Sequence, residues 1–302
     1  MMAGVRRRLA LLLLTAPLLG GCGDDEGSAG ERSVVAKTTQ VADLVRQVGG
    51  GRVEVEGMLR PGGDPHDYEP RPSDVQAVAD ADVVFSSGGE VDHWLEDVVG
   101  NAGGDAEVVT LIDSVERLDD DPHWWQDPRN ALAAVEAIRA RLARIDPDGR
   151  AVYERNAERL TRRLRSLDRA IAACIERVPP AKRKIVTTHD SLGYLARRYG
   201  IEVVGSVIPS LSTQAQASAG DVDELVQQIR REGVEAVFPE SSVNPDIERA
   251  IAREAGAEVG SPLYADSLGP PGSAGETYAG ALATDVRALV RGMSGGRVDC
   301  AL

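Results

Sequence analysis

The feature that most constrains this chain is an apolar stripe near its middle. From Tyr153 to Val178, apolar side chains recur at spacings of 4, 3, 4, 3, 4, 3 and 4 residues, the repeat that gathers them on one face of an α-helix. A helix over residues 147–178 would extend roughly 45 Å, the length of a whole domain. A coiled-coil dimer would show the same pattern. We expect an internal strut instead, because the stripe stands between two regions of alternating strands and helices.

Those two regions share one organisation. Short β-type runs alternate with helical segments at residues 34–37, 53–55, 82–86 and 107–111 before the stripe, and at 184–188, 201–207, 235–239 and 257–259 after it. Such alternation is typical of parallel sheets covered by helices. The sequence therefore predicts an α/β fold with two lobes of mainly parallel sheet flanked by helices and joined by one long linking helix. We expect an N-terminal lobe over 33–146, the linking helix over 147–178 and a C-terminal lobe over 179–302.

The first 22 residues have the pattern of an export signal. Three arginines at positions 6–8 precede an apolar run that is too short to span a bilayer comfortably. The stretch LGGC, residues 19–22, resembles a lipobox, the cleavage signal of bacterial lipoproteins, in which the new terminal cysteine is acylated. An ordinary secretory signal with a chance cysteine is the alternative. We therefore expect a signal peptide over 1–22, lipidation of Cys22, a flexible tether over 23–32, and an extracytoplasmic protein anchored to the cell membrane.

The net charge bears on the kind of partner, and the cysteine content bears on disulfide formation. The formal net charge is −14, and removal of residues 1–21, which carry three arginines and no acid, would make it more negative still. An acidic chain without a basic stripe argues against nucleic acid as a partner. Cys174 and Cys300 could form one disulfide in an oxidising compartment, although Cys174 lies on the apolar stripe and could equally be a buried free thiol.

Three of the four histidines lie in segments that follow predicted strands. These are His66, His123 and His189, and Asp266 lies in the corresponding late loop of the second region. Because ligands bind at the carboxyl ends of parallel strands, we expect two residues from each lobe to meet in one cleft. Three imidazoles and one carboxylate match a closed tetrahedral Zn²⁺ shell. The spacing alone is not a zinc signature.

The sequence gives weaker evidence that other polar and aromatic residues belong to the metal site. His93 stands at a helix start beside Trp94, and a surface or packed histidine is the preferred interpretation. Glu240 and Asn244 lie at a strand end, where they could orient a metal ligand or cap the following helix. Trp124 and Trp125 could wall the cleft, or pack in the core.

Six motifs, taken in order, resemble the metal-specific solute-binding proteins of bacterial ABC importers, the zinc and manganese binding family. They are GGDPHDYEPRPSD around His66, DPHWWQDP around His123, THDSLGYLARRYG around His189, STQAQASAGDVDEL (212–225), FPESSVNP (238–245) and LYADSLG around Asp266. The resemblance covers nearly all of the chain after the signal segment, although Gln126 stands where leucine is common. It implies that His66, His123, His189 and Asp266 are the metal ligands. It also implies an ABC permease as partner.

The third ligand position bears on the choice of metal. Members of the family that select Mn²⁺ often carry glutamate there, whereas this chain has His189, and an added imidazole favours Zn²⁺ over Mn²⁺. Many zinc-type members carry a long histidine-rich loop before the second ligand, but only LDDDP (118–122) stands here. We predict a high-affinity, monomeric Zn²⁺-binding lipoprotein that delivers the ion to a permease and is not an enzyme.

Three alternatives remain at this stage. The first is a Mn²⁺-binding protein of the same family. The second is a zinc hydrolase, but a catalytic site keeps one position open for water, and Asp266 would fill it. The third is a siderophore or cobalamin binder with the same helix-linked architecture, which would not need three histidines and an aspartate in its cleft.

Overall fold

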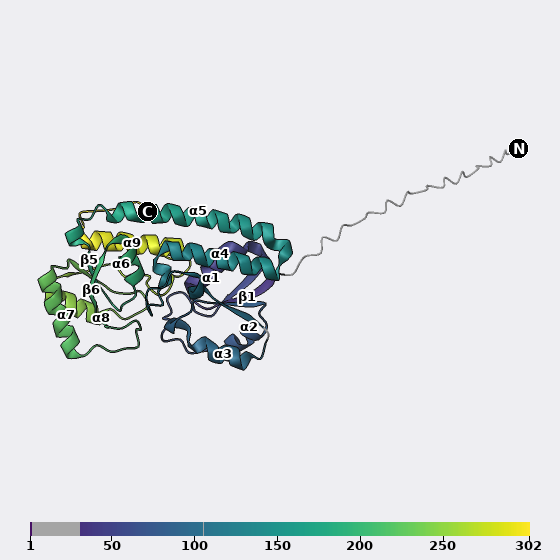
Figure 1. Cartoon of the computed structure of the whole chain (residues 1–302), viewed down its shortest axis with the longest axis horizontal. Coiled ribbons are helices and arrows are strands. Elements are labelled where there is room, and N and C mark those ends of the chain that lie inside the picture. Colours follow the sequence, from purple (N-terminus) through teal and green to yellow (C-terminus); the bar gives the residue numbers. More distant parts are fainter. Residues whose placement is uncertain (2–30, 105) are drawn as a thin grey trace. The chain divides into compact units, whose positions relative to one another are not determined.

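The computed structural model describes Met1, residues 31–104 and residues 106–302. Residues 31–302 belong to one unit, and the coloured part of Figure 1 shows its elements. The expected signal peptide, Cys22 and nearly all of the tether lie outside the described residues. Within the described part of the chain, every helix is too short or too polar to cross a bilayer.

The N-terminal lobe is built on a parallel four-stranded sheet. Its strands run in the order β2-β1-β3-β4, and they are β1 (Arg32–Ala36), β2 (Val53–Gly57), β3 (Val83–Ser86) and β4 (Glu107–Thr110). The helices of this region are α1 (Thr39–Gly49), α2 (Pro72–Ala79), α3 (Trp94–Ala102) and α4 (Pro128–Ile145). Every residue of β3 is buried, as expected for a parallel strand that is covered by helices on both faces.

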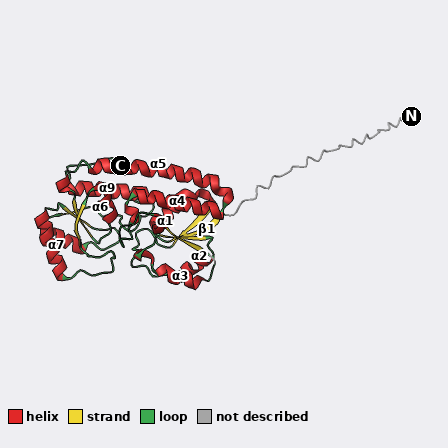
Figure 2. Cartoon of the chain, viewed as in Figure 1, coloured by secondary structure: helices red, strands yellow, loops and turns green. Residues whose placement is uncertain are grey.

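The C-terminal lobe repeats this arrangement. Its strands run in the order β6-β5-β7-β8, all parallel, and they are β5 (Lys184–Thr187), β6 (Glu202–Ser206), β7 (Ala236–Phe238) and β8 (Glu258–Val259). The helices are α6 (Gly193–Tyr199), α7 (Ala219–Glu232), α8 (Asp246–Ala255) and α9 (Tyr278–Met293). Figure 2 shows helices beside both sheets. The predicted two-lobed α/β fold is confirmed, and each predicted strand lies within a few residues of an observed one.

The predicted linking helix is α5 (Arg150–Ile175). It is shorter at both ends than the expected 147–178, because Pro147–Gly149 form a 3₁₀ turn before it and two prolines follow it. Its apolar stripe is buried against α1, α4 and α9 of the same chain, and Figure 1 shows α5 running alongside α4 and α9. The stripe therefore packs inside the chain, as the strut interpretation predicts.

One apolar core continues through both lobes. It joins the inner faces of the two sheets with α1, α4, α5, α6 and α9. Each lobe adds a smaller cluster on its outer side, under α2 and α3 in one lobe and under α7 and α8 in the other. The lobes therefore share a packed interior beneath α5.

The two ends of α5 are fixed by different chemistry. Near its start, Arg52 donates two hydrogen bonds of 2.7 and 2.8 Å to Asp146, and the hydroxyl of Tyr153 donates a third of 2.6 Å. The hydrogen bonds from Arg52 lower the pKa of Asp146 to about 2. Near the other end, Cys174 and Cys300 form a disulfide. Of the two possibilities for Cys174, the structure therefore shows the disulfide.

Candidate metal centre

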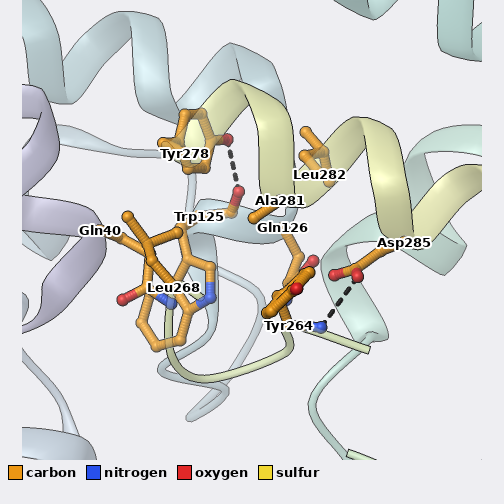
Figure 3. A pocket seen from close by; sticks show the side chains of 9 residues that line it. All are labelled: Gln40, Trp125, Gln126, Tyr264, Leu268, Tyr278, Ala281, Leu282 and Asp285. Carbon is orange, nitrogen blue, oxygen red and sulfur yellow. Dashed lines mark hydrogen bonds between the residues drawn. The ribbon is translucent and has the colours of Figure 1, made fainter. Parts of the chain in front are cut away.

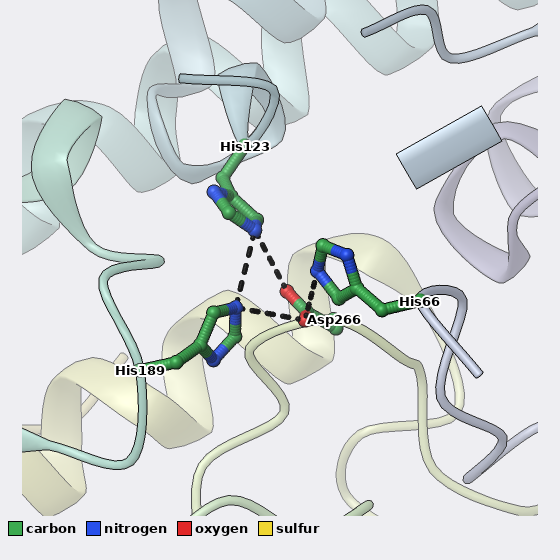
Figure 4. A group of neighbouring side chains, drawn as sticks. All are labelled: His66, His123, His189 and Asp266. Carbon is green, nitrogen blue, oxygen red and sulfur yellow. Dashed lines mark hydrogen bonds and ion pairs between the residues drawn. The ribbon is translucent and has the colours of Figure 1, made fainter. Parts of the chain in front are cut away.

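The four residues singled out by the sequence come together at the carboxyl ends of the strands. His66 lies in the loop after β2, and His123 lies in the segment after β4. His189 follows β5, and Asp266 follows β8. One potential ligand atom from each residue lies within 4.8 Å of all the others. Figure 4 shows the three imidazoles and the carboxylate pointing toward one another.

The distances between these atoms suit a small tetrahedral ion. Nε2 of His66 and Nε2 of His189 lie 3.3 and 3.2 Å from Asp266 Oδ2. Nε2 of His123 lies 3.5 Å from Asp266 Oδ1 and 3.3 Å from Nε2 of His189. A tetrahedron with metal–ligand bonds of about 2.0 Å has edges of about 3.3 Å. The four separations above, one of which is to the second carboxylate oxygen of Asp266, are close to that edge length.

Three polar atoms at this centre are buried and unpaired. Among the described residues, nothing hydrogen-bonds Nε2 of His66 or either carboxylate oxygen of Asp266, and the side chains of His66 and Asp266 are 1% and 0% exposed. Buried polar atoms are nearly always satisfied, since leaving them unpaired costs free energy. A cation between them would satisfy all of these atoms at once.

Two of the imidazoles are oriented by carboxylates behind them. Nδ1 of His123 lies 2.7 Å from Asp121 Oδ1, and Nδ1 of His189 lies 2.7 Å from Glu240 Oε1. An Nδ1–H that donates to a carboxylate leaves the Nε2 lone pair free, which is the form that binds a metal. Glu240 thus has the orienting contact that the sequence left open.

Asp121 was missed by the sequence analysis, although a signal for it exists. The tripeptide Asp-Pro-His occurs at both His66 and His123. In each copy the histidine N–H donates a 2.9 Å hydrogen bond to Oδ1 of the preceding aspartate, which is Asp64 or Asp121. Only Asp121 also reaches an imidazole ring. Asp64 instead accepts a 2.7 Å hydrogen bond from the hydroxyl of Thr213, in the STQAQ segment of the other lobe.

The charged groups of the centre shift one another's pKa values. Burial by itself raises the pKa of Asp266, but the neighbouring His189 and His123 outweigh burial and hold this pKa well below its usual range. Burial lowers the pKa of His189, but the charges of Asp266 and Glu240 outweigh it and raise this pKa well above its usual value. Burial raises the pKa of Glu240. The centre thus favours a positive charge beside Asp266.

The remaining sequence candidates lie away from the cluster or support it from behind. Asn244 is exposed and its Oδ1 accepts a hydrogen bond from the N–H of Asp246, the first residue of α8, although the N-cap position of that helix is Pro245. His93 is exposed, and its Nδ1 lies 2.9 Å from the carbonyl oxygen of Glu90. Trp124 is fully buried in the shared core, whereas the ring of Trp125 packs edge-on against His123 with 5.4 Å between centroids.

Comparison with known proteins agrees with this geometry. The family described as "Zinc-uptake complex component A periplasmic" matches residues 34–292. The chain belongs to this family. The family resemblance of the motifs is thereby confirmed, and the match includes all four residues of the candidate centre.

Two relatives match this chain over nearly its whole length, and one solved structure has the same fold. A protein of Halalkalibacterium halodurans named "Manganese-binding lipoprotein MntA" is 31% identical, over 94% of this chain and 97% of its own length. A protein of Bacillus subtilis with the same name is 30% identical, over 94% and 98%. The solved structure of the periplasmic zinc binding protein TroA from Treponema pallidum has a TM-score of 0.82 and 26% identity, covering 88% of this chain and 100% of TroA.

Proposed function

We propose that this protein is an extracytoplasmic lipoprotein that binds Zn²⁺ and delivers it to an ABC permease. His66, His123, His189 and Asp266 would hold the ion between the lobes. The observation that carries the proposal is the set of 3.2–3.5 Å separations among buried ligand atoms of these four residues, which come from both lobes. Those separations match the edges of a tetrahedral Zn²⁺ shell.

The donor set supports zinc over manganese. Three imidazole nitrogens and one carboxylate suit Zn²⁺, whereas Mn²⁺ prefers more oxygen ligands and a higher coordination number. A Mn²⁺-binding function is the second candidate, and the names of the two MntA relatives favour it. His189 is the residue on which the choice depends, because it supplies a nitrogen at the position where an oxygen ligand would favour Mn²⁺.

A role in binding agrees better with the centre than catalysis does. A zinc hydrolase keeps one metal position open for water, whereas here Asp266 stands within 3.5 Å of all three Nε2 atoms.

Delivery to a permease also requires that the protein be held at the membrane. The LGGC motif ending at Cys22 and the word "lipoprotein" in the relatives' names support a lipid anchor there.

A titration with both metals tests the proposal. The chain from residue 22 on, carrying Cys22→Ser so that it is not acylated, is stripped of metal and titrated calorimetrically with Zn²⁺ and with Mn²⁺. We expect one Zn²⁺ per chain, bound at least about tenfold more tightly than Mn²⁺. Tighter binding of Mn²⁺ would favour the second candidate, and turnover of ester or peptide substrates by the zinc-loaded chain would favour a hydrolase.

A further inference from the structure

The segment that carries Asp266 leaves its own lobe before it reaches the site. Leu263 is still held in the C-terminal lobe, since its N–H donates to the carbonyl of Pro239 and its carbonyl accepts from the N–H of Ser241, both at 2.9 Å. Two residues later, the carbonyl of Ala265 accepts hydrogen bonds from Trp125 Nε1 and Gln126 Nε2, both at 2.8 Å. Within two residues, the hydrogen-bond partners of the chain thus change from the C-terminal lobe to the N-terminal lobe.

The rest of this short segment, residues 265–268, is also bonded to the N-terminal lobe. The N–H of Leu268 donates a 2.8 Å hydrogen bond to the hydroxyl of Thr39, the first residue of α1. The N–H of Gly62 lies 2.9 Å from both the hydroxyl of Ser267 and the carbonyl of Leu268. Asp266 thus stands between residues that are tied to the N-terminal lobe on both sides.

Apart from Thr39, the partners of this segment come from the same two loops that carry His66 and His123. Gly62 precedes His66 by four residues, and Trp125 and Gln126 follow His123 by two and three. Trp125 and Gln126 are each 2% exposed. Together they occupy both acceptor positions of the Ala265 carbonyl. Because this carbonyl belongs to the peptide group that enters Asp266, its orientation sets where the Asp266 side chain begins.

The cavity next to residues 265–268 leaves this segment little room to shift. The cavity is small, about 10 Å³ in volume. Trp125, Gln126, Tyr264 and Leu268 are among the residues that line it (Figure 3). A cavity of this size holds about one water molecule at most. The hydroxyl of Tyr278 donates a 2.5 Å hydrogen bond to the carbonyl of Trp125, so the backbone that carries the two donors is itself fixed.

We infer that Trp125 and Gln126 are positioning residues that hold Asp266 at the site from the N-terminal lobe, with or without a bound ion. The inference rests on the proposed function, because it concerns the same metal centre. A carboxylate that is already in place loses less freedom when the ion binds, and preorganised groups bind more tightly for this reason. A leucine at position 126 could not donate the second hydrogen bond to the Ala265 carbonyl.

The two adjacent tryptophans provide a matched test. Trp125→Phe removes one of the two donors to the Ala265 carbonyl, and Gln126→Leu removes the other. Trp124→Phe is the control, since Trp124 is equally buried but its Nε1 donates to Ser87 within the N-terminal lobe. Each variant of the unacylated chain is measured in three ways: Zn²⁺ affinity by chelator competition, thermal unfolding without metal, and visible absorption of the Co²⁺-loaded form.

We expect Trp125→Phe and Gln126→Leu each to raise the Kd for Zn²⁺ about tenfold and to change the Co²⁺ absorption bands, which report the coordination geometry. Trp124→Phe should lower the unfolding temperature at least as much as Trp125→Phe while changing the Kd less than about twofold. Equal shifts of the Kd in Trp124→Phe and Trp125→Phe, or an unchanged Kd in Gln126→Leu, would overturn the inference. If the wild-type chain bound neither Zn²⁺ nor Co²⁺, the proposed function itself would fail.

Hydrogen exchange supplies a second measurement that needs no variant. The amides of Gly62 and Leu268 donate the hydrogen bonds that join the segment to the N-terminal lobe. If the segment is docked without metal, these amides should be protected to a similar degree in the metal-free and Zn²⁺-loaded chains. Protection that appears only with metal would show that the ion, and not Trp125 and Gln126, brings Asp266 into place.

Discussion

The two lobes follow one plan, and they differ in where each finds the carboxylate that orients its histidine. Both sheets have the same strand order, and each lobe presents an imidazole whose Nδ1 lies 2.7 Å from a buried carboxylate. In the N-terminal lobe, Asp121 comes from the same turn as His123. In the C-terminal lobe, Glu240 is 51 residues from His189, and parallel pairing of β5 with β7 brings the two strand ends together. A local turn and a sheet topology thus produce the same contact.

The lobes also differ in how they hold the linking helix. The end of α5 nearer the N-terminal lobe depends on the Arg52–Asp146 ion pair, and the other end depends on the Cys174–Cys300 disulfide. An ion pair is sensitive to acid, whereas a disulfide is sensitive to reductant. Each of these two differences can be tested by changing one lobe at a time.

The largest effect should come from removing one imidazole from either lobe. We expect His123→Ala and His189→Ala each to weaken Zn²⁺ binding by at least about a hundredfold, because each deletes a proposed ligand. Calorimetric titration measures the loss. His93→Ala is the control and should bind as the wild type does, since its ring lies at an exposed helix start. A large loss for only one lobe's histidine would contradict an interlobe site.

The next effect concerns stability at the disulfide end of α5. Cys300→Ser should lower the free energy of unfolding by about 2–5 kcal/mol, because the cross-link restricts a long loop of the unfolded chain. Urea unfolding with and without reductant measures it. Reductant should destabilise the wild type and leave the variant unchanged, and an equal response of both proteins would refute the prediction.

The orienting carboxylates should have matching effects in the two lobes. Asp121→Asn and Glu240→Gln should each weaken Zn²⁺ binding by about 10- to 100-fold, because an amide cannot orient and polarise the imidazole as a carboxylate does. Competition with a chelator measures the change. Asp64→Asn is the matched control, since Asp64 contacts the backbone of His66 and Thr213 but no imidazole ring. An equal loss in Asp64→Asn would mean that the loop, and not the ring contact, matters.

The smallest effect should appear at the acid-sensitive end of α5. Asp146→Asn should lower the free energy of unfolding by about 1.5 kcal/mol at pH 7, because it weakens charged hydrogen bonds to Arg52. The pKa of Asp146 is about 2 in the folded chain, below the usual value of about 3.9. Its contribution is therefore complete above about pH 4 and is lost as the pH falls toward 2.

The pH dependence of unfolding distinguishes this pair from an ordinary surface pair. The stability curves of wild type and Asp146→Asn should converge as the pH approaches 2. Asp82→Asn serves as the control, because the Arg32–Asp82 pair is more than a third exposed on both sides, and such pairs contribute little. A constant difference between wild type and Asp146→Asn down to pH 2 would assign the loss to something other than ionisation.

Local patterns in the sequence were sufficient for the fold and for the meeting of the four site residues. The 4, 3 spacing from Tyr153 onward determined which face of α5 is buried, and the alternating runs determined two parallel sheets. Because parallel strands end at one edge of a sheet, the positions of His66, His123 and His189 after strands were enough to expect convergence. Asp266 was expected there from its place in the corresponding late loop of the second lobe, and the repeated Asp-Pro-His tripeptide could have identified Asp121.

Only the tertiary structure decided which distant partners meet. Nothing near Glu240 in the sequence singles out His189, and Asp266 follows the last strand of one lobe yet is held by Trp125 and Gln126 of the other. The sequence named Cys174 and Cys300 as a possible pair, but only the structure shows that they are bonded. The physical reason is that the periodicity of apolar residues shows only which face of each helix or strand is buried. The choice of partner depends on strand register and on packing between segments that are far apart in the chain, and no local pattern encodes it.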